Sequence, residues 1–117
     1  MLTAARASGA PGGVAGSPPM TERIMFATMK AQPGKRDELK AAFAGMFEQA
    51  ATEPGTLLYT LVEGDDPDTL YFWEQYADQA AMDAHMGSDA LAALHQKLGG
   101  LLADGGAVTG TVVRKLR

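Results

Sequence analysis

The sequence predicts an α+β domain with the element order βαββαβ, in which helices cover one face of a four-stranded antiparallel sheet. Two observations support this prediction. Short runs rich in apolar, β-branched and aromatic residues are bounded by turn signals made of Pro, Gly and Asp. Between them lie stretches in which apolar residues recur every three to four positions, which is the spacing of one helix face.

The first patterned segments predict a strand and then a helix. The run from Ile24 to Met29 is apolar and β-prone, and the turn signal Gln32-Pro33-Gly34 follows it. A helix is expected from about Lys35 to Thr52, because one of its faces carries an apolar stripe. The stripe consists of Leu39, Phe43, Met46, Phe47 and Ala50. Glu53-Pro54-Gly55 ends this helix, since proline removes a backbone donor and disfavours helical geometry.

The next segments predict an antiparallel hairpin. Thr56 to Glu63 and Thr69 to Tyr76 are rich in the residue types that favour strands. The intervening Gly64-Asp65-Asp66-Pro67-Asp68 has the composition of a hairpin loop. We therefore expect the second and third strands to pair with each other.

Two short helices and a last strand complete the predicted fold. Asp78 is a suitable N-cap for a helix from Gln79 to Met86, which Gly87 ends. Ser88 caps a further helix, whose apolar residues are Leu91, Leu94, Leu98, Leu101 and Leu102. A glycine pair weakens the last turn of that helix, and Ala107 to Val113 is the expected fourth strand.

This order of elements is that of a ferredoxin-like fold, and it leaves one face of the sheet uncovered. On the third strand Leu70, Phe72 and Tyr76 alternate with Tyr71 and Trp73, so both faces are apolar or aromatic. Soluble monomers rarely expose such a large apolar surface. We therefore expect a homodimer in which two sheets pack face to face, as in a dimeric α/β barrel.

The chain divides into a leader and one folded domain. Residues 1–21 are rich in Gly, Pro, Ala and Ser and are expected to be disordered, whereas residues 22–117 form the domain. Gly and Pro interrupt the apolar run that a signal peptide would need. Met20 stands directly before the patterned region, so it is an alternative start of translation.

The bulk composition narrows the function classes. The net charge is −4, from ten Lys plus Arg against fourteen Asp plus Glu, and it offers no basic surface for nucleic acid. No apolar run is long enough to cross a membrane. The sequence has no cysteine, which excludes a disulfide framework and a thiolate nucleophile and favours a cytoplasmic location.

Two titratable side chains are the main candidates for catalysis. His85 follows Ala81 and Met82 by four and three positions, so it lies on the apolar side of its helix. There it is either a structural core histidine or a base that faces a cavity. Glu74 and Trp73 are strand neighbours and leave from opposite faces. Buried without a partner, Glu74 would have a raised pKa and could act as an acid or base, whereas paired with Arg or Lys it would be structural.

The surroundings of these residues predict a small apolar pocket. We expect its ligand contacts to come from the second and third strands and the last two helices, namely from Trp73, Tyr59, Phe72, Met82 and His95. A core position is an alternative for His95, which follows Leu91 by four residues. No metal site is expected, because the two histidines lack a clear third ligand. The sequence also lacks phosphate-binding and dinucleotide-binding motifs, so no cofactor is expected.

Short motifs give the region from about Ile24 to Arg117 a resemblance to a known family. These motifs are Gln32-Pro33-Gly34-Lys35, Glu53-Pro54-Gly55, Tyr71-Phe72-Trp73-Glu74-Gln75-Tyr76 and Ala81-Met82-Asp83-Ala84-His85 before a serine. In order and spacing they resemble the antibiotic biosynthesis monooxygenase domain of the dimeric α/β-barrel superfamily, which includes quinol monooxygenases.

The resemblance implies a cofactor-independent oxygenase. In such enzymes a bound phenol or quinol loses a proton, and the resulting anion reduces O₂ directly. By this resemblance His85 is the base or hydrogen-bond partner, Glu74 and Trp73 belong to the strand-three motif, and Tyr59 is a ligand contact. The implied partners are a small aromatic substrate and O₂.

Departures from the family pattern keep other functions open. Many relatives carry Ser-Pro-His where this chain has Ser88, Asp89 and Ala90. Haem-degrading relatives carry a segment similar to the one that ends at His95, but they have Trp at the position of His85 and Asn on the first strand. The alternatives are therefore an acid-base isomerase of a small carbonyl compound, a non-catalytic barrel that binds a small ligand or acts in a stress response, and haem degradation.

Overall fold

A computed structural model of the chain describes residues 21–117. The expected leader lies outside the described residues except for Thr21, and so does the alternative start at Met20. The described elements are β2 (Arg23–Ala31), α1 (Arg36–Ala42), α2 (Ala44–Ala51), β3 (Thr56–Glu63), β4 (Thr69–Tyr76), α3 (Gln79–Met86), α4 (Asp89–Lys97) and β5 (Leu102–Thr111).

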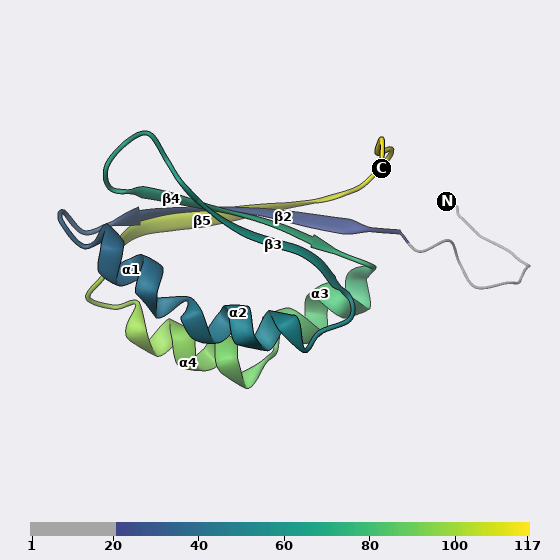
Figure 1. Cartoon of the computed structure of the whole chain (residues 1–117), viewed down its shortest axis with the longest axis horizontal. Helices are drawn as coiled ribbons and strands as arrows, with labels where there is room; N and C mark the ends of the chain where they lie inside the picture. The colour runs from purple at the N-terminus through teal and green to yellow at the C-terminus, as the bar shows by residue number, and fades with distance from the viewer. Residues whose placement is uncertain (1–20) are drawn as a thin grey trace, which may run out of the picture.

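The four strands form one antiparallel sheet in the order β3-β4-β2-β5. Figure 1 shows all four helices on the same side of this sheet, with α2 and α4 running next to each other. The predicted ferredoxin-like α+β fold is thereby confirmed. Within residues 21–117 no helix covers the opposite face of the sheet, hereafter the uncovered face.

Strand register decides which side chains meet the helices. Met25 pairs with Glu74, Ala27 with Phe72 and Met29 with Leu70, and all of these project towards the helices. They join a core whose fully enclosed members include Leu39, Met46, Leu70 and Phe72. The alternate residues Phe26 and Trp73 pair with each other on the uncovered face, where their rings meet edge to face with centroids 4.4 Å apart.

The first helix differs from its prediction, because two helices replace the single one expected from Lys35 to Thr52. The interruption is at Phe43, whose backbone N–H donates to the carbonyl of Lys40, three residues back, rather than four. This tighter turn keeps the Phe43 ring buried against Phe72, with ring centroids 4.8 Å apart. Phe47, expected on the buried stripe, is 39% exposed and packs against Tyr59.

The end of the chain also differs from its prediction. The helix that begins after Ser88 ends at Lys97, and Leu101 and Leu102 belong to the following turn and strand. The last strand begins at Leu102 and ends at Thr111, rather than running from Ala107 to Val113. The segment is rich in glycine, yet it pairs continuously with β2 from Asp104 onwards, so pairing overrides the low strand preference of glycine.

Both N-caps and the hairpin are as predicted. Asp78 accepts from the N–H of Ala81 at 2.8 Å, and Ser88 accepts from the N–H of Leu91 at 3.2 Å. Strands β3 and β4 have the expected bounds. These caps fix the starts of α3 and α4, and thereby the positions of His85 and His95.

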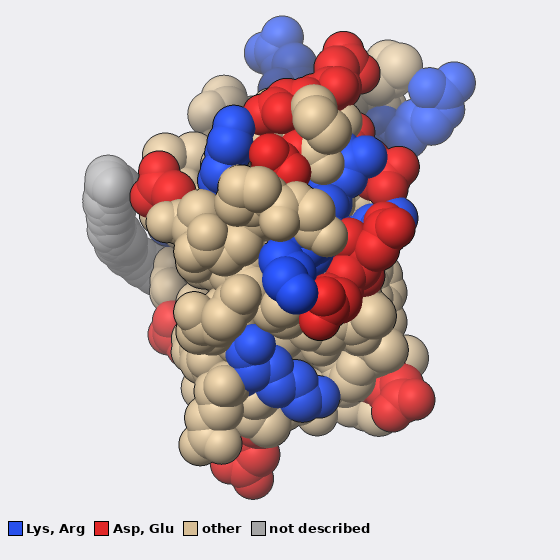
Figure 2. All heavy atoms as spheres, turned by 90° about the vertical axis from the view of Figure 1, so that its left-hand side faces the viewer, with Lys and Arg blue, Asp and Glu red and all other residues tan. Residues whose placement is uncertain are grey.

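Ion pairs gather at the end of the molecule that holds the β3–β4 loop, where Figure 2 shows Lys and Arg interleaved with Asp and Glu. The Nζ of Lys30 lies 2.7 Å from Asp66, and that of Lys40 lies 2.6 Å from Glu63. Arg36 donates to the carbonyl oxygen of Asp66 at 2.8 Å. Such exposed pairs each contribute little to the stability of the fold.

Candidate functional site

A cavity of about 350 Å³ lies between the sheet and the helices. Its wall is mostly apolar, with side chains from the sheet and from the α1–α2 and α4 helices, among them Met25, Met29, Phe43, Phe72, Leu91 and Leu94. Strand β5 contributes its first residue, Leu102, and the small residues Gly105, Gly106 and Ala107 to the wall. Because Gly105 and Gly106 have no side chains, this part of β5 leaves room for the cavity beneath α4.

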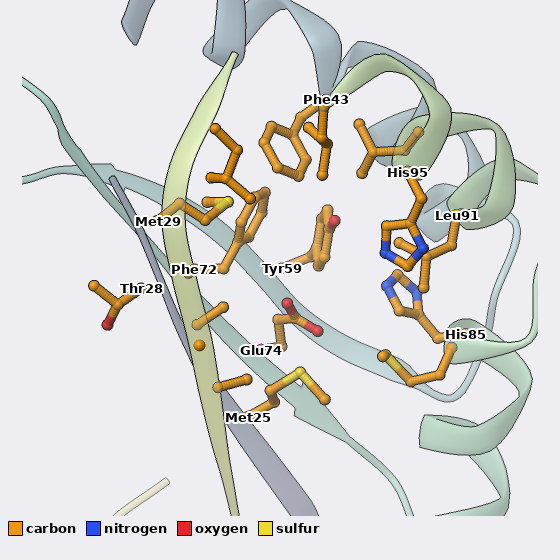
Figure 3. A pocket seen from close by; sticks show the side chains of 18 residues that line it. Met25, Thr28, Met29, Phe43, Tyr59, Phe72, Glu74, His85, Leu91 and His95 are labelled. Atoms are coloured by element: carbon orange, nitrogen blue, oxygen red, sulfur yellow. The ribbon is translucent and has the colours of Figure 1, made fainter. Parts of the chain in front are cut away.

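The polar side chains that face this cavity are Tyr59, Glu74, His85 and His95. Figure 3 shows the Glu74 carboxyl and both imidazoles directed into the cavity, and the Tyr59 ring along its far wall. Tyr59 and Glu74 come from neighbouring strands in register, whereas the two histidines come from α3 and α4. A few polar groups that converge in an apolar cavity are typical of a ligand site.

His85 is almost fully enclosed, with 1% of its surface exposed. Its Nδ1 lies 2.7 Å from Oε1 of Glu53, and the rings of Tyr59 and Tyr76 flank it at centroid distances of 5.1 and 5.4 Å. Its other ring nitrogen, Nε2, has no hydrogen-bond partner within residues 21–117. Among residues 21–117, the one side-chain nitrogen or oxygen that is fully buried and has no hydrogen-bond partner is Nε of Arg23. Nε2 of His85 is therefore not fully buried. Nε2 is therefore free to meet a molecule in the cavity.

Glu53 is the residue that the sequence did not single out as functional. Besides meeting His85, it accepts from Nε2 of Gln49 at 2.9 Å and from the Thr56 hydroxyl at 2.8 Å. Burial alone would raise the pKa of Glu53, but the hydrogen bonds from Gln49, His85 and Thr56 together hold it below the ordinary value. Its only sequence signal was its place just before a Pro-Gly turn.

The Pro-Gly turn packs against α3 and the residues just before it, which explains why Glu53 and His85, far apart in the sequence, lie close together. The N–H of Ala77 donates to the carbonyl of Gly55 at 2.8 Å. Gly55 also lies so close to Ala81 that a Cβ added to the glycine would stand 2.5 Å from the Ala81 Cβ. Only glycine permits this approach, and the approach brings Glu53 within reach of His85.

Glu74 is the second titratable group of the cavity and is 6% exposed. The Tyr76 hydroxyl donates a short hydrogen bond to its carboxyl group. Burial raises the pKa of Glu74, and the hydrogen bond from Tyr76 and the charge of His85 offset only part of this effect. Burial also raises the pKa of Tyr59, as do the nearby carboxylates of Glu74 and Glu53, so its hydroxyl keeps its proton at neutral pH.

The structure brings together five of the seven predicted site residues, namely Tyr59, Phe72, Glu74, His85 and His95. Trp73 lies on the uncovered face of the sheet, 45% exposed, because strand alternation points it away from Glu74. Met82 is buried in a separate cluster with Met25 and Tyr76 and does not line the cavity. The side chain of Thr28, which stands where haem-degrading relatives carry Asn, also points away from the cavity (Figure 3).

Within residues 21–117, no three His, Cys, Asp or Glu side chains are grouped so that they could hold a metal ion. Over the same residues, no helix has the length and apolar character required to cross a bilayer.

Comparison with known proteins identifies the family. A family model described as antibiotic biosynthesis monooxygenase matches residues 23–97, which is more than half of the chain. The chain belongs to the antibiotic biosynthesis monooxygenase family. The resemblance inferred from its motifs is thereby confirmed, and so is its relationship to monooxygenase-like proteins.

Solved structures agree with this family. Protein SO0527 from Shewanella oneidensis is 28% identical, with a TM-score of 0.73, and the match covers 80% of this chain and 92% of that one. A Caulobacter crescentus protein named as a "putative antibiotic biosynthesis monooxygenase" is 26% identical, with a TM-score of 0.75 and coverage of 82% and 93%. PA3566 from Pseudomonas aeruginosa, at 22% identity, a TM-score of 0.76 and coverage of 84% and 100%, shares the fold. A search of curated proteins gave no match.

Proposed function

We propose that this member of the antibiotic biosynthesis monooxygenase family is a cofactor-independent monooxygenase of small electron-rich aromatic compounds. The observation that carries the proposal is the enclosed imidazole of His85, whose Nε2 opens onto an apolar cavity of about 350 Å³. A neutral imidazole in such a place is suited to take a proton from a phenol or quinol.

The reaction that this geometry supports begins with proton transfer from the substrate to Nε2 of His85. The substrate anion then gives electrons to O₂, and a carbon–oxygen bond forms to give a peroxide. When the O–O bond breaks, one oxygen atom stays on the substrate and the other leaves as water with two substrate hydrogens. All the electrons come from the substrate, so the chemistry needs no further reductant.

The cavity wall favours a neutral substrate. Neither Lys nor Arg is among its lining residues, whereas the Glu74 carboxyl faces the interior. An anionic group placed there would be desolvated without a cationic partner, which is costly. The aromatic side chains Phe43, Tyr59 and Phe72 offer surfaces on which a planar ring can pack. We therefore expect uncharged quinols or anthrone-like phenols rather than carboxylated or phosphorylated aromatics.

Oxygen uptake by metal-stripped protein tests the proposal. The substrates are a small panel of neutral hydroquinones and anthrone-like phenols, each with a carboxylated analogue as its matched control. His85→Ala should lower kcat by about 10²–10⁴-fold, the usual contribution of a general base. His95→Ala removes the other imidazole of the cavity and should cost less, because His95 is exposed and has no contact with Glu53. Equal uptake by the wild-type protein and His85→Ala would refute the proposal.

One observation favours a second function, the isomerisation of a small carbonyl compound. Glu74, with its raised pKa, is suited to hold a proton, while His85 is suited to accept one. Together they could move a proton between two carbons of the same substrate. Exchange of a substrate C–H hydrogen with deuterated water, without oxygen uptake, would support this alternative, and binding without exchange or uptake would indicate a ligand-binding barrel.

We also infer that two copies pack through the uncovered face of the sheet. Large apolar side chains are exposed there, namely Phe26, Leu58, Val62, Tyr71, Trp73 and Val108. A homodimer would remove them from water. Trp73→Glu should shift the mass in light scattering towards the monomer, whereas Ala92→Glu on the exposed side of α4 should not. A monomeric wild-type protein would refute the inference.

A further inference from the structure

We propose that Glu53 is a positioning residue that fixes the tautomer of His85, with the proton on Nδ1 and the lone pair of Nε2 directed into the cavity. The catalytic part of this inference rests on the proposed function, because it assumes that Nε2 of His85 is the base. The structural part stands on the contacts of Glu53 alone.

The carboxylate of Glu53 has three hydrogen-bonding neighbours. Thr56 and Gln49 each direct a donor at Glu53, one to Oε1 and one to Oε2, and His85 is the third neighbour at 2.7 Å. An ionised carboxylate can only accept. The ring nitrogen that faces it must therefore carry the hydrogen, which leaves Nε2 unprotonated in the neutral ring.

The Glu53 carboxylate also remains ionised at neutral pH. The hydrogen bonds of Glu53 outweigh its burial and keep its pKa low. Gln49 is on α2 and Thr56 begins β3, so donors on both sides of the turn hold the carboxyl group in place. A preorganised acceptor of this kind selects one tautomer before any ligand arrives.

Glu53 positions His85 and does not itself touch a ligand in the cavity. Glu53 is not among the residues that line the cavity, and His85 stands between it and any ligand. A change at Glu53 should therefore alter the rate of proton transfer with little effect on binding. In kinetic terms kcat should fall while KM stays nearly constant.

The test is ¹⁵N NMR of the imidazole side chains in the full-length protein at a pH where the rings are neutral. His85→Ala identifies the His85 signals by their loss. We expect the wild-type protein to show Nδ1 with a protonated-type shift and Nε2 with an unprotonated-type shift. This measurement needs neither turnover nor a variant at Glu53, so it does not depend on the proposed activity.

Glu53→Gln is the matching variant, because its amide can either accept from Nδ1 or donate to it. We expect a mixture of the two His85 tautomers and a kcat lowered by about 10–100-fold, less than the full contribution of a general base. Glu48→Gln on α2 is the control, since Glu48 is exposed and its side chain makes no hydrogen bond or ion pair within residues 21–117. It should change neither the tautomer nor kcat.

Two results would overturn the inference. One is a wild-type His85 with its proton on Nε2, and the other is a Glu53→Gln protein that keeps the wild-type tautomer. A wild-type protein with the expected tautomer but no oxygen uptake on any substrate would support the positioning role of Glu53 and count against the monooxygenase function alone.

Discussion

Gly55→Ala should destabilise the protein and disturb the site through a single steric contact. The added Cβ would stand 2.5 Å from the Cβ of Ala81, whereas nonbonded carbons prefer about 3.5–4.0 Å, so the turn and α3 must separate by about 1 Å. Overpacking of this size costs about 1–3 kcal/mol. For a domain of this length the Tm should fall by roughly 4 °C or more, as measured by calorimetry. The separation also pulls Glu53 away from His85, so the His85 tautomer should become mixed.

Two further variants separate this clash from a general effect of replacing glycine. Gly45→Ala places a methyl group where nothing lies within 4 Å and should stabilise α2 by up to about 1 kcal/mol. Ala81→Gly combined with Gly55→Ala removes the opposing Cβ, so the pair should be more stable than the sum of the single changes predicts. A Gly55→Ala protein that melts at the wild-type temperature, or additive effects in the double variant, would refute the reasoning.

Three further predictions concern stability. Burial raises the pKa of Glu74, so ionisation of this carboxyl group in the folded protein opposes folding. Glu74→Gln should therefore be more stable than the wild-type protein above the pKa of Glu74, and it should lose less stability as pH rises through that pKa. Urea unfolding at several pH values checks this. The hydrogen bond from Lys30 lowers the pKa of Asp66 to about 2, so the stability that Asp66 contributes is complete above the pKa of the unfolded state and is lost as pH falls towards 2. In Asp66→Asn the stability should therefore depend less on pH in this range, as followed by circular dichroism during acid unfolding. Leu39→Ala should lower the free energy of unfolding by about 2–5 kcal/mol, which is more than Leu94→Ala, because Leu39 is fully buried in the core while Leu94 already borders a cavity. Equal losses in chemical denaturation would contradict this.

Local sequence patterns were sufficient to predict much of the fold. Strand-favouring residue types and the hairpin-loop composition identified the bounds of β3 and β4, and the Asp78 cap identified the start of α3, because these features depend on neighbours in the sequence. The break at Phe43 was not predictable in this way. It depends on the contact between Phe43 and Phe72, which are far apart in the chain. The length of β5 likewise depends on pairing with β2, which overrides a glycine-rich sequence.

Less of the site could be predicted, because it too depends on contacts between residues that are far apart in the chain. Helical spacing placed His85 on an inward face, and strand alternation separated Glu74 from Trp73. The partner of His85 could not be found from spacing, because Glu53 reaches it only through the close approach of Gly55 to α3. Trp73 was assigned to the pocket through a motif, although its strand position sends it to the other face.

The cavity lies where a small domain would otherwise complete its core. Its wall includes members of both buried clusters, the larger one around Leu39 and Phe72 and the smaller one formed by Met25, Tyr76 and Met82. Filling this space would gain dispersion contacts, and removing the Glu74 charge would relieve desolvation. The fold instead keeps an open space with a buried carboxyl group and an oriented imidazole around it. A cavity and a buried carboxyl group that lower stability in this way are expected where binding rather than stability determines the side chains. Variants that fill the cavity should therefore gain stability as they lose ligand binding, and this opposition is what distinguishes a functional cavity from a packing defect.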